Sequence, residues 1–114
     1  MTKFVRTGEN LGPRGDYYSW CKIDDKGYPE FGEEQGNYAG GATLSRTFYG
    51  KFDTRYPDDH IPTQEYWTDV ENNLKYWKKK DVDFYNSIVS MFAENNIVVN
   101  NEGNIEYDKC GMDD

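Results

Sequence analysis

The uneven distribution of glycine along the chain constrains the fold more than any other feature. Of the 11 glycines, nine lie in residues 1–60 and none lies in residues 61–102. Glycine permits the positive φ angles of tight turns and weakens the interior of a helix. We therefore expect turn-rich β structure in residues 1–60 and helices in residues 61–95, which together make an α+β fold.

The core must be built largely from aromatic rings. Leu, Ile, Val and Phe supply only 20 of the 114 residues, and the net charge is −8, a combination that approaches the composition of disordered chains. However, the chain also contains 10 Tyr and 3 Trp, and each such ring buries roughly 150–250 Å². A chain of this length supports one core, so we expect a single domain spanning residues 1–114.

Alternating side chains predict strands in the glycine-rich half. Residues 17–23 are rich in strand formers, and alternation places Tyr18 and Trp20 on one face and Cys21 and Ile23 on the other. Residues 24–27 read as a turn and residues 28–31 as the partner strand, which Pro29 predicts to be an edge strand. We expect a third strand within residues 42–52.

Capping residues and apolar spacing predict helices at about 63–80 and 81–95. Thr63 and Asp81 are suitable N-caps, and the apolar residues after them follow helical spacing (Trp67, Val70, Leu74, Trp77, Phe84, Ile88, Met91, Phe92). The same stripe keeps heptad spacing across Asp81, so one unbroken helix in an oligomer is the alternative. The expected architecture is a small antiparallel sheet packed against one or two helices.

The C-terminal region predicts a β-hairpin over residues 96–108. Residues 97–99 and 104–107 are strand-like and flank the turn-forming residues 100–103. Residues 109–114 are expected to form an acidic tail.

No motif in the chain specifies a reaction. His60 follows Asp58 and Asp59, which could ligate a metal, but this short match is also what an ordinary turn looks like. Neither Cys21 nor Cys110 lies in a nucleophile motif, and Cys21 reads as a small buried residue. We therefore expect no enzyme activity, no catalytic residue, no metal and no cofactor.

The same composition excludes several partners. The chain shows neither a secretory signal nor an apolar run long enough for a membrane span, which favours a cytoplasmic protein without membrane contact. Its acidity argues against direct binding of nucleic acid. Two cysteines are too few for a disulfide scaffold.

Acidic and aromatic residues cluster around the first predicted hairpin. This pattern is typical of a surface that docks onto a basic protein, where carboxylates stand in for phosphates and rings supply anchors. The predicted contact residues are Asp24, Asp25, Glu30, Glu33, Glu34, Tyr17, Tyr28 and Tyr76. The leading hypothesis is a small inhibitor or adaptor that occupies a basic surface of a nuclease or another nucleic-acid-binding enzyme. A DNA mimic carried by a phage or mobile element, acting in a bacterium or infected cell, fits this class.

Two alternatives belong to other classes. One is a domain that sequesters a small molecule or nucleotide, with Arg46 or Arg55 contacting the ligand. The other is a structural subunit of a larger assembly, for which an exposed heptad stripe would be the evidence. The oligomeric state stays open, with a homodimer among the alternatives.

Overall fold

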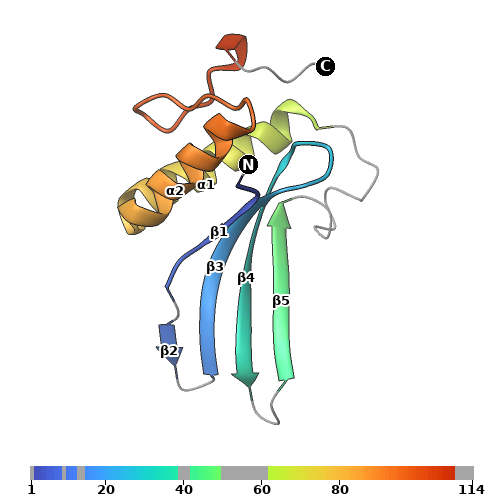
Figure 1. The fold of residues 1–114 in the computed structure, drawn as a ribbon, viewed down its shortest axis with the longest axis vertical. Helices are drawn as coiled ribbons and strands as arrows, with labels where there is room; N and C mark the ends of the chain where they lie inside the picture. Colours follow the sequence, from blue (N-terminus) through green and yellow to red (C-terminus); the bar gives the residue numbers. More distant parts are fainter. Residues whose placement is uncertain (1, 9, 13–14, 39–41, 50–61, 110–114) are drawn as a thin grey trace.

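A computed structural model describes residues 2–8, 10–12, 15–38, 42–49 and 62–109, and the side chains of residues 2–8, 17–34 and 62–108. Within these ranges five strands form one antiparallel sheet beside two helices, which confirms the α+β class (Figure 1). The strands are β1 (Phe4–Arg6), β2 (Asn10–Gly12), β3 (Gly15–Ile23), β4 (Pro29–Tyr38) and β5 (Ala42–Tyr49).

The sheet order is β1-β3-β4-β5, and β2 pairs with β3 beyond the end of β1. The prediction that the strand after the first turn lies at an edge is wrong, because β4 lies between β3 and β5. Pro29 is tolerated because it is the first residue of β4, opposite Ile23, and pairing with β5 begins only at Phe31. The proline therefore lacks its N–H at a position where β4 pairs with β3 alone, so no hydrogen bond to β5 is lost there.

Two helices follow, α1 (Gln64–Lys80) and α2 (Val82–Glu94), as predicted. The Thr63 hydroxyl accepts a hydrogen bond from the Tyr66 backbone N–H at 3.3 Å. Asp81 divides the helices: its backbone N–H donates to the Trp77 carbonyl at 2.9 Å, and its carboxylate accepts from the Phe84 N–H at 3.1 Å. One residue thus ends α1 and caps α2, which excludes the unbroken helix.

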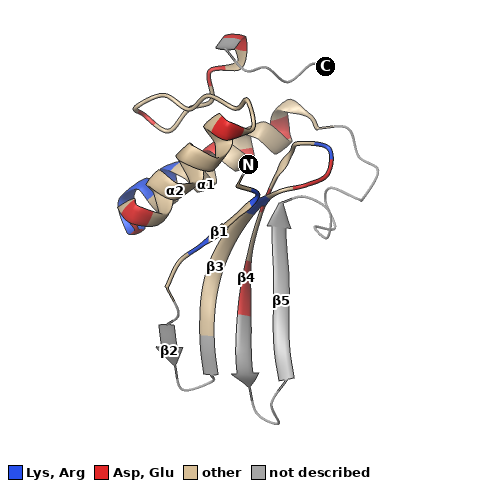
Figure 2. Ribbon diagram, viewed as in Figure 1, with Lys and Arg blue, Asp and Glu red and all other residues tan. Residues whose placement is uncertain are grey.

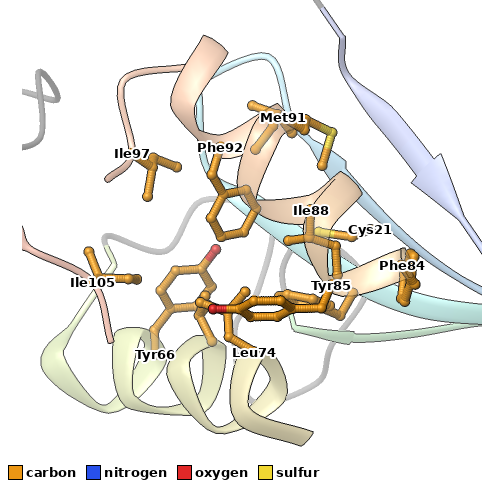
Figure 3. Packing of buried hydrophobic residues seen from close by; sticks show 13 residues of the cluster. Cys21, Tyr66, Leu74, Phe84, Tyr85, Ile88, Met91, Phe92, Ile97 and Ile105 are labelled. Carbon is orange, nitrogen blue, oxygen red and sulfur yellow. The ribbon is translucent and has the colours of Figure 1, made fainter. Parts of the chain in front are cut away.

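The core lies between the helices and one face of the sheet. Phe92 and Tyr85 of α2 point toward Tyr66 and Leu74 of α1, and Cys21 of β3 lies behind Ile88 (Figure 3). Aromatic rings make up much of the buried cluster, with aliphatic side chains between them (Cys21, Ile23, Phe31, Tyr66, Val70, Leu74, Phe84, Tyr85, Ile88, Met91, Phe92, Ile97, Ile105).

The predicted C-terminal β-hairpin is not confirmed. The segment turns at Gly103, which has a φ of +83°, but it forms only an isolated bridge between Val99 and Ile105. Backbone hydrogen bonds join the two arms on either side of this bridge, from the Asn100 N–H to the Asn104 carbonyl and from the Glu106 N–H to the Val98 carbonyl, both at 2.8 Å. Other N–H groups of the segment bond to the helices. The Ile105 N–H donates to a Glu71 carboxylate oxygen at 2.8 Å, and the Ile97 N–H closes α2 on the Phe92 carbonyl at 2.8 Å.

The sheet is longer than the helical layer. Figure 1 shows the lower halves of β3, β4 and β5 extending past both helices, so the helices cover only the end of the sheet near the β3–β4 turn. None of the described helices is both long and apolar enough to cross a membrane.

Candidate binding cleft

The eight predicted contact residues do not form one surface. They divide into three groups: the β3–β4 turn, the face of the sheet away from the helices, and the face toward the helices. Figure 2 shows the described Asp and Glu residues spread over the helices, the turn and β4, with Lys and Arg among them. An acidic strip along residues 24–34 is therefore absent from the described part of the chain.

The turn group contains Asp24, Asp25 and Tyr28. The Asp24 carboxylate accepts hydrogen bonds from the backbone N–H groups of Lys26 and Tyr28, both at 2.9 Å, so it shapes the turn. Asp25 is exposed. Tyr28 packs edge-on against Trp67, with the ring centroids 6.2 Å apart. This contact within the domain therefore uses part of the surface of the Tyr28 ring.

Glu30 and Glu34 lie on the face away from the helices. Glu30 is only 1% exposed, and its carboxylate lies 3.7 Å from the Lys22 ammonium. This burial contradicts the expectation that Glu30 contacts a partner. A side chain that is almost fully covered has no exposed surface for a partner to bind. The Glu34 carboxylate accepts a hydrogen bond from the Tyr18 hydroxyl.

Tyr17, Glu33 and Tyr76 are brought together on the helix side of the sheet. They line a cleft of about 830 Å³ between β3, β4 and the C-terminal half of α1. The remaining lining residues come from these elements and from the segments beside β1 and α2 (Thr7, Gly8, Ser19, Trp20, Phe31, Gly32, Asn72, Asn73, Trp77, Lys80, Asp81). The cleft therefore joins residues far apart in the sequence.

Strand register and helical periodicity together create this cleft. Ser19 pairs with Glu33 across β3 and β4, and Tyr17 lies two residues before Ser19, so all three project from one face. On α1, Asn72, Tyr76 and Lys80 follow one another at four-residue spacing. The sheet continues beyond this end of α1, and the cleft forms at the step.

The walls of the cleft mix exposed rings with charged groups. Tyr17 is 42% exposed and Tyr76 is 53% exposed, whereas Trp77 is partly buried behind Tyr76 with the two ring centroids 5.0 Å apart. Trp77 in turn packs edge-on against Phe84 at 4.8 Å. This stack fixes the base of the Tyr76 wall against the core.

Asn73 contributes a buried polar atom to the same wall. Its Oδ1 has no hydrogen-bond partner among the described residues. An unsatisfied buried acceptor costs free energy, so native proteins keep few of them. This oxygen is covered by surrounding atoms, so its cost falls on the stability of the domain.

The described lining of the cleft includes neither a cysteine nor a histidine. Cys21, the described cysteine, is fully buried in the core, and burial together with the nearby Glu30 charge raises the pKa of its thiol. The described residues include no cluster of three or more potential metal ligands. The chemistry offered here is recognition by rings, amides and charge.

Some of the residues named in the sequence analysis lie partly or wholly outside the described residues. The backbone of Arg46 pairs with that of Glu33 in β5, but its side chain lies outside the described residues. Arg55, His60 and Cys110 lie outside them entirely.

Sequence reasoning missed Asn72, Asn73, Trp77 and Lys80 as site residues. Trp77 was assigned to the core stripe, which it only partly joins. A usable signal was the polar amide pair one helical turn before Tyr76 on an otherwise amphipathic helix. Comparison of the chain with protein-family models, curated proteins and solved structures gives no match. We therefore base the functional proposal on the cleft.

Proposed function

We propose that the protein is a small acidic inhibitor or adaptor that binds a basic surface of another protein. A nuclease or another nucleic-acid-binding enzyme is the class of partner with such a surface, and we place the encounter in the cytoplasm of a bacterium or infected cell. The net charge of −8 favours association with cationic partners and speeds encounter.

The cleft is the observation that carries this proposal. Tyr17 of β3 and Tyr76 of α1 leave large parts of their rings exposed in the cleft, and Glu33 of β4 also lines it. Rings beside a depression are the anchors that protein interfaces commonly use. Because the acids of residues 24–34 occupy three places, recognition through the cleft has more support than mimicry of a regular row of DNA phosphates.

Capture from a bacterial lysate at low salt, followed by elution with rising salt, tests the proposal. We expect a basic partner that is retained by the wild type and released as salt rises. The Tyr17→Ser/Tyr76→Ser double variant should retain at least about tenfold less of it, since two interface anchors are lost. Tyr107→Ser removes an equally exposed ring, 46% exposed outside the cleft, and serves as the control. Equal retention by the double variant and the wild type would contradict the proposal.

A second candidate is sequestration of a small molecule or nucleotide. The cleft volume of about 830 Å³ falls in the range of small-molecule sites. Among the described lining residues, the charges of Glu33 and Asp81 disfavour phosphate, and Lys80 is the cation that opposes them. A rise in melting temperature with AMP, absent in Tyr76→Ser, would favour this candidate over the first.

The heptad stripe does not favour the structural-subunit alternative. Its evidence would have been an exposed heptad stripe, yet Val70, Leu74, Ile88 and Met91 are fully buried in the core of the domain.

A further inference from the structure

The two edges of the sheet differ in how they are protected. At one edge, β1 has three residues, and the chain before it is tied to the end of α2. The Thr2 N–H donates to a Glu94 carboxylate oxygen at 2.9 Å, and the Asn95 side-chain amide donates to the Thr2 carbonyl at 3.0 Å. At the other edge, β5 has eight residues and pairs with β4, and no further strand of the described part lies beside it. Its Ala42 end lies beyond the helices (Figure 1).

β5 lacks most of the features that protect sheet edges. Natural edge strands are very short, carry lysine or proline, or are bent by bulges, because their unpaired N–H and C=O groups invite another strand. β5 contains neither proline nor lysine, and its charged residue is Arg46. The residue inserted in β5 is Phe48, so the strand has no insertion from Ala42 to Thr47. This edge is therefore suited to pair with a further strand.

The sequence of β5 favours a second copy of the chain as that strand. Two antiparallel copies related by a two-fold axis contact each other through the same residues. Ser45 has a threonine two residues away on each side, Thr43 and Thr47. An axis at Ser45 places Thr43 opposite Thr47 of the partner subunit, and Thr–Thr pairs stabilise antiparallel strands. The strand is therefore complementary to itself.

The other registers with an axis near the middle of β5 are less favourable. An axis at Arg46 sets two guanidinium groups opposite each other, and opposed like charges destabilise paired strands. An axis at Leu44 pairs only residues 42–46 of β5, whereas an axis at Ser45 pairs residues 42–48. The register centred on Ser45 thus combines a long ladder with Arg46 opposite Leu44 of the partner subunit.

We propose that the chain forms a homodimer in which β5 pairs antiparallel with β5 of a second copy, with the two-fold axis at Ser45. The two sheets then continue into one another across the interface. The described lining of the cleft comes from other elements, so this inference goes beyond the proposed function and does not depend on it.

Disulfide trapping tests the position of the axis. The background is Cys110→Ser, in which the other cysteine, Cys21, is fully buried. Ser45→Cys places two thiols on the axis, where opposed Cα atoms lie about 5 Å apart, a distance that a disulfide spans. Thr43→Cys is the matched control, because its two copies lie about 13 Å apart along the strand. With copper phenanthroline as the oxidant, Ser45→Cys should give about tenfold more covalent dimer than Thr43→Cys.

Sedimentation of the full chain over a range of concentrations measures the dimer itself. Each copy carries a net charge of −8, so rising salt screens the repulsion and should strengthen the dimer, whereas it should weaken capture of a basic partner. Ser45→Lys sets two ammonium groups opposite each other and should weaken the dimer at least about tenfold. Ser90→Lys makes the same change at an exposed position of α2 and should leave the dimer unchanged.

Several results would overturn the inference. One is a chain that stays monomeric at every concentration and salt, and another is a dimer that Ser45→Lys and Ser90→Lys affect equally. Equal trapping of Ser45→Cys and Thr43→Cys would also overturn it, because another surface would then join the copies. If the chain is monomeric and a captured basic partner slows exchange of the β5 amides, the edge receives a strand of that partner; the inference fails and the proposed function stands. If the dimer forms through Ser45 but no basic partner is captured, the inference stands and the proposed function fails.

Discussion

Tyr66 is a core residue of α1 that the apolar spacing did not identify. Apolar spacing selects Trp67 as the first core residue of α1, but Tyr66 is fully buried and Trp67 only partly so. The Tyr66 hydroxyl donates a hydrogen bond to the carbonyl of Pro29 at the start of β4, and burial raises its pKa well above the ordinary value. This partner lies 37 residues away, so local spacing could not identify it.

Asn73→Leu is predicted to stabilise the domain. The substitution removes a buried oxygen that has no partner among the described residues, and relief of such a group is worth about 1 kcal/mol. Urea unfolding should show the gain. Asn72→Leu, at an exposed position, is the control and should change stability little. A loss of stability in Asn73→Leu would mean that its amide is satisfied and would contradict the reading of this wall.

At the scale of elements, local signals predicted the helices and the first turn. Thr63 and Asp81 cap through neighbours three residues away, and Gly27 takes a φ of +90° in the turn that Asp24 holds. The sequence analysis did not predict β1 and β2, because a strand of three residues is too short to show an alternating pattern. β1 pairs with a distant part of the sequence, with Phe4 opposite Lys22, whereas β2 pairs with the nearby start of β3, with Gly12 opposite Gly15.

The C-terminus of α2 explains why Ile97 does not start a strand. Asn96 adopts a left-handed φ of 67°, and the N–H of Ile97 reaches back to the Phe92 carbonyl in a Schellman arrangement. Ile97 then enters the core instead of starting a strand. The apolar residues at 97 and 99 belong to the packing of the core: Ile97 is in the buried cluster and Val99 packs against it.

Asp81→Ala is predicted to lower the free energy of unfolding by about 1–2 kcal/mol, because α2 loses its capping oxygen. Asp81→Asn, which keeps a capping oxygen, should retain most of the stability. Chemical denaturation followed by far-UV circular dichroism measures both. An unchanged midpoint in Asp81→Ala would contradict the assignment of Asp81 as the cap that separates the helices.

At the scale of the whole molecule, the proposed function depends on a cleft formed where the sheet is longer than the helical layer. The strands run past the helices, and the step between them brings Tyr17, Glu33 and Tyr76 to one cleft (Figure 1). The sequence analysis predicts these three as contact residues. It also groups them with Asp24, Asp25 and Glu30, because residues close in sequence are expected to lie close in space. The approach of α1 to β3 is tertiary and carries no local signal.

Backbone hydrogen exchange of the chain with and without its captured partner tests the central claim most directly. Amides at the interface exchange more slowly in the complex because the partner excludes water from them. The account predicts slowed exchange in residues 17–20, 31–33 and 72–81, which form the cleft. Slowed exchange confined to the β3–β4 turn and the segment around Tyr107, with the cleft unchanged, would contradict it.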